Sequence, residues 1–164
     1  MSCNNKSSLQ QYFVQNQDQP NFVSVDISPS ILTIDKLKLT SEEVTILSSF
    51  QKINVLVFKV NQTNKRRYTA EKSKLVAILK DTTNYHQLIK FGSGAAGASI
   101  SFVGDEKHID EFVLFGNKKE NGFAVARILG NDMKPENALK LFSILQKATI
   151  DSKQLDVLSG ILSN

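Results

Sequence analysis

The sequence has little of several residue types from which binding and catalytic sites are commonly built. It contains one cysteine, two histidines and no tryptophan among 164 residues. A single thiol excludes an intramolecular disulfide framework and any zinc site that needs two thiolates. No apolar run reaches the ~18 residues that a membrane-spanning helix requires. What is present, 41% hydrophobic and 22% charged residues, is typical of a globular domain that buries its own core.

The first half of the chain mixes strand and helix patterns. Residues 22–27 alternate apolar with small or polar side chains, and the nearly continuous apolar run at 54–60 is typical of a central strand. Thr40 and Glu43 have the spacing of a capping box, so a helix is expected to begin there. Apolar residues at helical intervals indicate a further helix over 67–81.

After residue 84 the apolar residues recur with a period of two. This pattern predicts four successive strands, over residues 85–91, 98–103, 110–116 and 122–129. Their short connections favour an antiparallel meander, and Pro135 is a favourable first residue for a closing helix. We therefore expect an α+β fold. Its sheet is mostly antiparallel with about five to six strands, in a mixed first half and a C-terminal four-strand meander, and its helices pack on one face.

The N-terminal residues differ in composition from the rest. Residues 1–20 are rich in Asn, Gln and Ser, which predicts a flexible polar leader or tether, and the apolar triplet Tyr12, Phe13 and Val14 within it is compatible with part of a weak helix. Residues 21–164 contain no internal repeat and are expected to form a single α+β domain.

A literal G-x-G-x-x-G motif spans Gly92 to Gly97. In a dinucleotide-binding site such glycines lie between a strand and the helix whose N-terminus meets the pyrophosphate. Here residues 98–103 continue as a strand, so the pattern favours a small-residue hairpin loop and implies no cofactor.

The segment from Asp105 to Glu111 gathers four carboxylates and one imidazole. Its weak candidate metal ligands are Asp105, His108 and Asp110. The spacing matches no EF-hand loop and no zinc-hydrolase motif, so a solvated turn between strands is favoured and no metal site is expected. Neither His86 nor His108 accompanies a nucleophile motif, so the sequence indicates no catalytic set.

Basic residues concentrate between positions 52 and 90. This segment holds nine Lys or Arg against two acids, an excess of +7 within a chain of net charge +4. The candidate basic surface on the predicted third helix consists of Lys65, Arg66, Arg67, Lys72 and Lys74. Such residues can contact the phosphates of nucleic acid or another acidic surface. No nucleic-acid-binding module has its signature here, so an ordinary solvated helix face is favoured.

The lone cysteine, Cys3, precedes the polar leader. Small residues before a cysteine and a polar tether after it are typical of bacterial lipoproteins, in which the thiol is acylated. The charged and apolar regions of a signal do not appear in this sequence. The alternative is an exposed cysteine in a cytoplasmic protein, and the leader alone does not decide between the two.

The body of the chain resembles a known family. The likeness is strongest at residues 111–115, followed by 122–133, which look like paired strands, a Gly turn and the lead into a last helix. The chain thereby resembles the Bacteroidota family catalogued as domain of unknown function 4252, over about residues 22–145. Members are typically small, signal-bearing and often lipoprotein-like. The resemblance implies an envelope location and carries over no catalytic residues.

We therefore expect a non-catalytic binding or accessory module of the cell envelope, a periplasm-facing or surface lipoprotein attached through Cys3. Its partners would be envelope proteins or acidic surfaces that the sequence does not name. The alternative is a cytoplasmic nucleic-acid- or polyanion-binding protein that uses the basic helix. A hydrolase or a metal-dependent enzyme is the least favoured interpretation.

Overall fold

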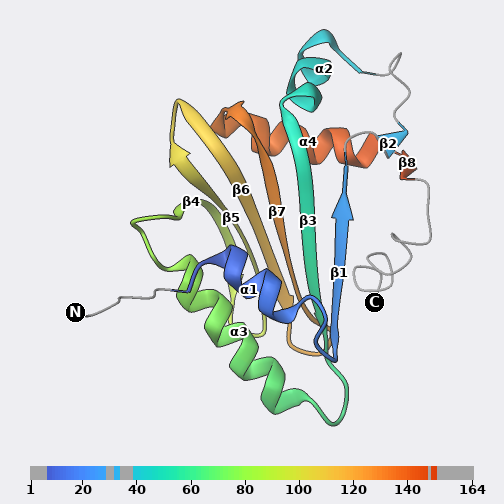
Figure 1. Ribbon diagram of the computed structural model, residues 1–164, viewed down its shortest axis with the longest axis vertical. Coiled ribbons are helices and arrows are strands. Elements are labelled where there is room, and N and C mark those ends of the chain that lie inside the picture. Colours follow the sequence, from blue (N-terminus) through green and yellow to red (C-terminus); the bar gives the residue numbers. More distant parts are fainter. Residues whose placement is uncertain (1–6, 29–31, 34–38, 148, 151–164) are drawn as a thin grey trace.

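The fold is built on one antiparallel sheet. The computed structural model describes residues 7–28, 32–33, 39–147 and 149–150. Its six-stranded sheet has the order β1-β3-β7-β6-β5-β4 (Figure 1). The strands are β1 (Phe22–Ile27), β3 (Phe50–Lys59), β4 (His86–Ser93), β5 (Ala96–Asp105), β6 (His108–Lys118) and β7 (Gly122–Met133). A separate two-stranded ladder pairs β2 (Leu32–Thr33) with β8 (Thr149–Ile150). The expected α+β fold with its antiparallel sheet is confirmed.

The meander occupies the half of the sheet that the sequence indicated. Strands β4 to β7 pair antiparallel in chain order, and β7 then pairs with β3, so that Val55 lies opposite Ala126. β1 completes the sheet by pairing antiparallel with β3, with Val25 opposite Val55. β4 and β1 are consequently the two edge strands of this sheet.

Four helices accompany the sheet in the described residues: α1 (Leu9–Asn16), α2 (Ser41–Ser48), α3 (Lys65–Leu79) and α4 (Pro135–Lys147). The capping box expected at α2 is present, because the Thr40 hydroxyl accepts from the Glu43 amide and the Glu43 carboxylate accepts from the Thr40 amide. α1 begins with a second capping box, formed by Ser8 and Gln11.

The helices lie on both faces of the sheet, which corrects the expectation of one covered face. Figure 1 shows α1 and α3 in front of the sheet and α4 crossing its far side. On β3, Leu56 and Phe58 join the core beneath α1 and α3, while Val55 and Val57 join the core that includes residues of α2 and α4. Because successive strand residues face opposite sides, the continuous apolar run of β3 reflects burial on both sides.

Helix α1 lies inside the segment that the sequence assigned to a flexible leader. Its Leu9 is fully buried, and the Leu9 amide donates to the Tyr85 hydroxyl at 3.2 Å. The Tyr12 hydroxyl donates to the Glu71 carboxylate of α3 at 3.0 Å. The expectation is therefore wrong for residues 9–16, because an apolar face at positions 9, 12 and 13 packs against α3 and the sheet. The folded unit begins before residue 21.

Candidate binding cleft

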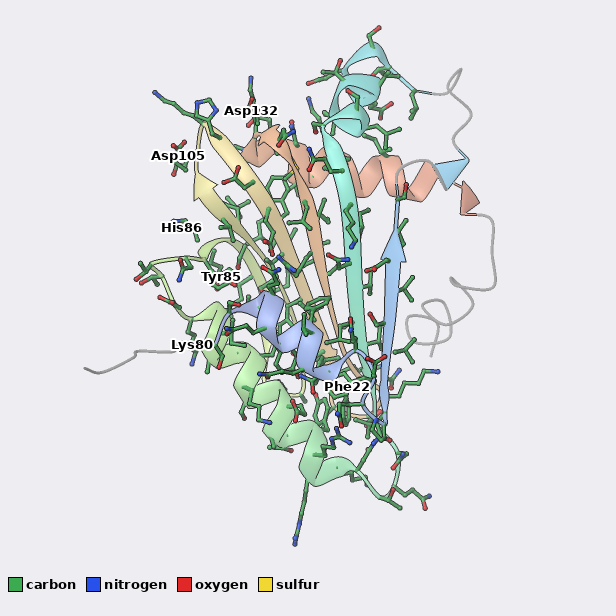
Figure 2. All side chains as sticks on the ribbon, viewed as in Figure 1. Phe22, Lys80, Tyr85, His86, Asp105 and Asp132 are labelled. Carbon is green, nitrogen blue, oxygen red and sulfur yellow. The ribbon has the colours of Figure 1, made fainter. Side chains whose placement is uncertain are left out.

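Charged and apolar groups line a cleft where α3 crosses β4 and β5, near the sheet edge formed by β4. The cleft has a volume of about 290 Å³. Three lysines line it, Lys72 and Lys80 from the α3 side and Lys90 from β4, and we call it the lysine cleft. Figure 2 places Lys80 just after the end of α3, on the side of the molecule where β4 begins at His86.

The three lysines differ in whether the described chain provides a hydrogen-bond partner for them. The Lys72 ammonium donates to the Gly94 carbonyl at 2.7 Å and is thereby held across the mouth of the β4–β5 turn. Within the described part of the chain, Lys80 and Lys90 have neither a side-chain hydrogen bond nor an ion pair. None of the described residues that line the cleft is an acid. Lys80 and Lys90 therefore present positive charge that the described part of the chain leaves unneutralised.

The turn at the cleft mouth is formed by the G-x-G-x-x-G motif. β4 and β5 pair up to Ser93 and Ala96, which leaves Gly94 and Ala95 as a two-residue hairpin turn and confirms the expected loop. Gly92 has φ +61° and Gly94 has φ +64°, values that L residues with side chains rarely adopt. A Cβ at Gly92 would lie 2.5 Å from the Ala96 carbonyl oxygen, so the backbone path around the cleft requires glycine there.

Apolar groups complete the cleft beside the lysines. Phe115 belongs to the buried core beneath α3, and Val76 and Leu79 of α3 pack partly against that core. Phe91 on β4 lines the cleft with 61% of its surface exposed. A phenylalanine this exposed at a sheet edge contributes little to the core, so its ring is available to a ligand.

Polar groups that carry no charge lie on the β5 and β6 side. Ser101 is buried in the cleft wall, and the Asn117 amide donates to the Gly94 carbonyl at 3.1 Å, the same acceptor that Lys72 uses. A neighbouring hollow shares Lys72 and Gly94 with the cleft and reaches Tyr68. The Tyr68 hydroxyl lies beside Asn117, but it is buried and makes no hydrogen bond of normal geometry within the described residues.

The five basic residues that the sequence grouped on the third helix differ in their contacts. Arg67 lies over the Phe22 ring, 5.7 Å from its centroid, and Lys74 pairs with the buried Glu71 at 3.0 Å. Lys65 and Arg66 are exposed at the start of α3. Of the five, only Lys72 lines the cleft. Lys80 and Lys90, which belong to the same charge excess, are the cleft residues that the sequence grouping missed.

The acidic segment forms a turn in which Asp105 and His108 have hydrogen-bond partners within the chain. The Asp105 carboxylate accepts from the amides of Lys107 and His108 at 2.8 and 3.1 Å, and these bonds lower the pKa of Asp105. His108 Nδ1 lies 2.9 Å from Asp132, which raises the pKa of His108 through a hydrogen bond and opposite charge. Among the described residues no three His, Cys, Asp or Glu side chains are placed to hold a metal, and these include the candidates Asp105, His108 and Asp110.

The last acid of this segment is neutralised in the core. Arg127 grips Glu111 with two hydrogen bonds, Nε to Oε1 at 2.9 Å and Nη2 to Oε2 at 3.1 Å. Their side chains are 12% and 10% exposed, and the Arg127 guanidinium also lies 5.7 Å from the centre of the Phe13 ring. This fork geometry ties β6 to β7 beneath α1. Glu111 therefore has a structural role.

The proposed attachment residue, Cys3, lies outside the described residues. Ser7 and Ser8, where the described chain begins, line a hollow together with Asp81 and Tyr85. The start of α1 is therefore next to the connection from α3 to β4. Among the described helices, none is long and apolar enough to cross a membrane.

Comparison with known proteins places this fold in a family. A family model described as "Domain of unknown function (DUF4252)" matches residues 12–141, which is most of the chain. The match begins within α1 and covers the six-stranded sheet and the lysine cleft. The chain belongs to the DUF4252 family. The suspected resemblance is thus confirmed, and with it an uncharacterised role. No curated protein and no solved structure matches this DUF4252 chain significantly.

Proposed function

We propose that this DUF4252 protein is a non-catalytic binding module of the cell envelope that engages an anionic partner at the lysine cleft. The observation that carries the proposal is the pair of lysines, Lys80 and Lys90, that border a shaped cleft without an acid among its lining residues. Unneutralised cations at a concave surface attract an anionic ligand and form charge-assisted hydrogen bonds with it.

The binding role is favoured over acid–base or metal chemistry by the state of the titratable groups. The acids nearest to a catalytic pattern, Asp105 and Glu111, already accept hydrogen bonds from the chain's own amides and guanidinium. His108 is paired with Asp132 on the exposed β5–β6 turn. Asp105, Glu111 and His108 therefore already have partners within the fold, whereas Lys80 and Lys90 have none among the described residues.

The envelope location in this proposal depends on acylation of Cys3. The five residue steps from Cys3 to Ser8 reach at most about 18 Å, whatever path they take. Because α1 is fixed to Tyr85 and to α3, a lipid on Cys3 would hold the folded domain close to the membrane surface. A single acyl chain anchors only marginally, so the proposal requires a multiply acylated cysteine.

Mass spectrometry of protein from cells that express the complete gene tests the attachment. We expect the protein in the membrane fraction, with acyl mass on the peptide that contains Cys3, and release of a Cys3→Ser variant into the soluble fraction. An unmodified Cys3 in the soluble fraction would contradict the envelope anchor and favour the cytoplasmic alternative.

Retention on a phosphocellulose column tests the binding role separately. Three double variants remove the same charge: Lys80→Gln/Lys90→Gln in the cleft, Lys65→Gln/Arg66→Gln at the start of α3, and Lys107→Gln/Lys134→Gln at exposed positions elsewhere. The cleft variant should elute at the lowest salt concentration. Equal elution of all three would show that only net charge matters. A dominant effect at Lys65 and Arg66 would favour the nucleic-acid or polyanion alternative.

A further inference from the structure

The lysine cleft combines two properties that an inorganic anion would not use together. It offers unneutralised ammonium groups, and it offers an apolar surface that continues from the core to the exposed Phe91. A purely ionic partner would gain nothing from that apolar surface, and a purely apolar partner would leave Lys80 and Lys90 without counter-ions. The juxtaposition therefore specifies a ligand with both characters.

We propose that the ligand of the lysine cleft is an amphipathic anion, a molecule with one carboxylate or phosphate head and a short apolar body. The head binds Lys80 and Lys90, and the apolar body covers Val76, Leu79 and Phe91. This inference rests on the proposed function, because it names the chemical class of the anion that binds at the same site.

The size of the cleft limits the apolar body. Its volume of about 290 Å³ is just below the ~300–1,000 Å³ of ordinary small-molecule sites. A short chain therefore fills it, and further methylenes would remain in water. Each methylene that leaves water raises affinity by up to about fourfold, so affinity should rise with chain length and then level off.

A second feature, independent of the lysines, lies beside the cleft. Tyr68 is 5% exposed, and its buried hydroxyl has no hydrogen-bond partner of normal geometry among the described residues. It borders the hollow that shares Lys72 and Gly94 with the cleft. A hydroxyl that is buried without a hydrogen-bond partner destabilises the fold, because the hydrogen bonds it made to water in the unfolded chain are not replaced. The hydroxyl lies beside Asn117 and has no exposed surface, so a polar atom of a bound molecule would reach it only after the neighbouring side chains shift.

Isothermal titration calorimetry with a series of carboxylates tests the proposal. Butanoate, hexanoate, octanoate and decanoate carry the same head and are used below the concentrations at which they form micelles. Affinity should rise at least about tenfold from butanoate to octanoate, as the four added methylenes enter the cleft. Octan-1-ol and octylammonium, which lack the negative head, should bind at least about tenfold more weakly than octanoate.

Variants locate the binding and separate the two proposals. Lys80→Gln/Lys90→Gln should weaken octanoate at least about tenfold, while Lys107→Gln/Lys134→Gln leaves it within about twofold. Phe91→Ser should reduce the dependence on chain length without weakening butanoate. Equal affinity along the series, with the cleft lysines still required, would overturn the amphipathic ligand and leave the anion-binding function intact. An absence of lysine-dependent binding by any of these anions would overturn both.

A final comparison distinguishes the two sources of such a head group. Octyl phosphate has the apolar body of octanoate and the head of a phospholipid-derived molecule. Tighter binding of octyl phosphate would assign the site to phosphate-bearing amphiphiles, and tighter binding of octanoate would assign it to free acyl carboxylates. Weaker binding of both than of inorganic phosphate would contradict the proposal.

Discussion

The lysine cleft and the β5–β6 turn are both strongly charged, but the charges differ in whether the described chain supplies partners for them. In the turn, Asp105 accepts two backbone amides, and His108 lies against Asp132. At the cleft, Lys80 and Lys90 lack such partners within the described chain. Figure 2 shows Asp105 and Asp132 at the end of the sheet away from α3, whereas Lys80 lies at the end of that helix.

The difference teaches that the local number of charges does not identify a site. The acidic segment was the denser cluster in the sequence, yet Asp105, His108 and Glu111 within it already have partners in the fold. The basic residues of α3 also differ in this respect. Arg67 lies over the Phe22 ring and Lys74 forms an ion pair with Glu71. Only charges that the chain leaves unneutralised beside a cleft are available for binding. Four predictions sharpen or break this contrast.

The largest effect is expected where a partnered charge lies in the core. Arg127→Met leaves Glu111 buried without its counter-ion, so the free energy of unfolding should fall by about 3–5 kcal/mol. Urea denaturation followed by circular dichroism measures this loss. Lys134→Met, at an exposed position, is the matched control and should change stability by less than about 0.5 kcal/mol. Equal effects of the two variants would refute the structural role of the pair.

A smaller effect is expected from the backbone of the cleft mouth. Gly94→Ala should cost about 1–2 kcal/mol, because φ is +64° but a Cβ there meets open space. Gly92→Ala should cost at least about 1 kcal/mol more, since its Cβ would meet the Ala96 carbonyl oxygen at 2.5 Å. Thermal denaturation of the two single variants gives the comparison. A larger loss at Gly94 would show that the turn is built differently.

The cleft lysines should contribute almost nothing to stability. The Lys80→Gln/Lys90→Gln variant is expected to unfold within about 1 kcal/mol of the wild type, because neither lysine loses a partner of the described chain. At low ionic strength the variant should be slightly more stable than the wild type, because removing two positive charges relieves the repulsion among the lysines. Urea denaturation at two salt concentrations measures both effects. A substantial loss of stability would mean that these lysines serve the fold, as Arg127 does.

The smallest effect concerns the exposed turn. Asp132 raises the pKa of His108, so Asp132→Asn should return it toward the ordinary histidine value. Proton NMR titration of the imidazole measures this shift. Because the folded pKa is raised, the pair's contribution to stability is full below the unfolded pKa and is lost as pH rises through the folded pKa. An unchanged His108 pKa in the variant would show that the pair does not form in solution.

The sequence was sufficient for the sheet because its strands carry local patterns. The first strand, Phe22–Ile27, has the expected bounds, and the four meander strands each include most of the predicted residues. Strand patterns are local, and short connections leave an antiparallel meander few alternatives. The two-sided burial was also present in the continuous apolar run at 54–60, which is typical of a strand covered on both faces.

The sequence indicated only part of a weak helix where α1 lies, because the polar composition of residues 1–20 was given more weight than the spacing of their apolar residues. The eight residues of α1 include several amides, yet Leu9, Tyr12 and Phe13 have the i, i+3, i+4 spacing of a buried helix face. The lysine cleft could not be derived in the same way. Lys80 and Lys90 lie ten positions apart and converge only because α3 packs across β4 and β5. That packing depends on tertiary contacts that no local pattern encodes.

The most direct test of the central claim compares the two charged regions in a single experiment. In an amide NMR titration with octanoate, Gly92, Gly94 and Gly97 report on the cleft and Gly104 reports on the end of β5 beside the acidic turn. We predict saturable shifts of the three cleft glycines, with Gly104 unmoved, and loss of these shifts in Lys80→Gln/Lys90→Gln. Unmoved cleft glycines, or equal shifts at Gly104, would contradict the assignment of the lysine cleft as the binding site.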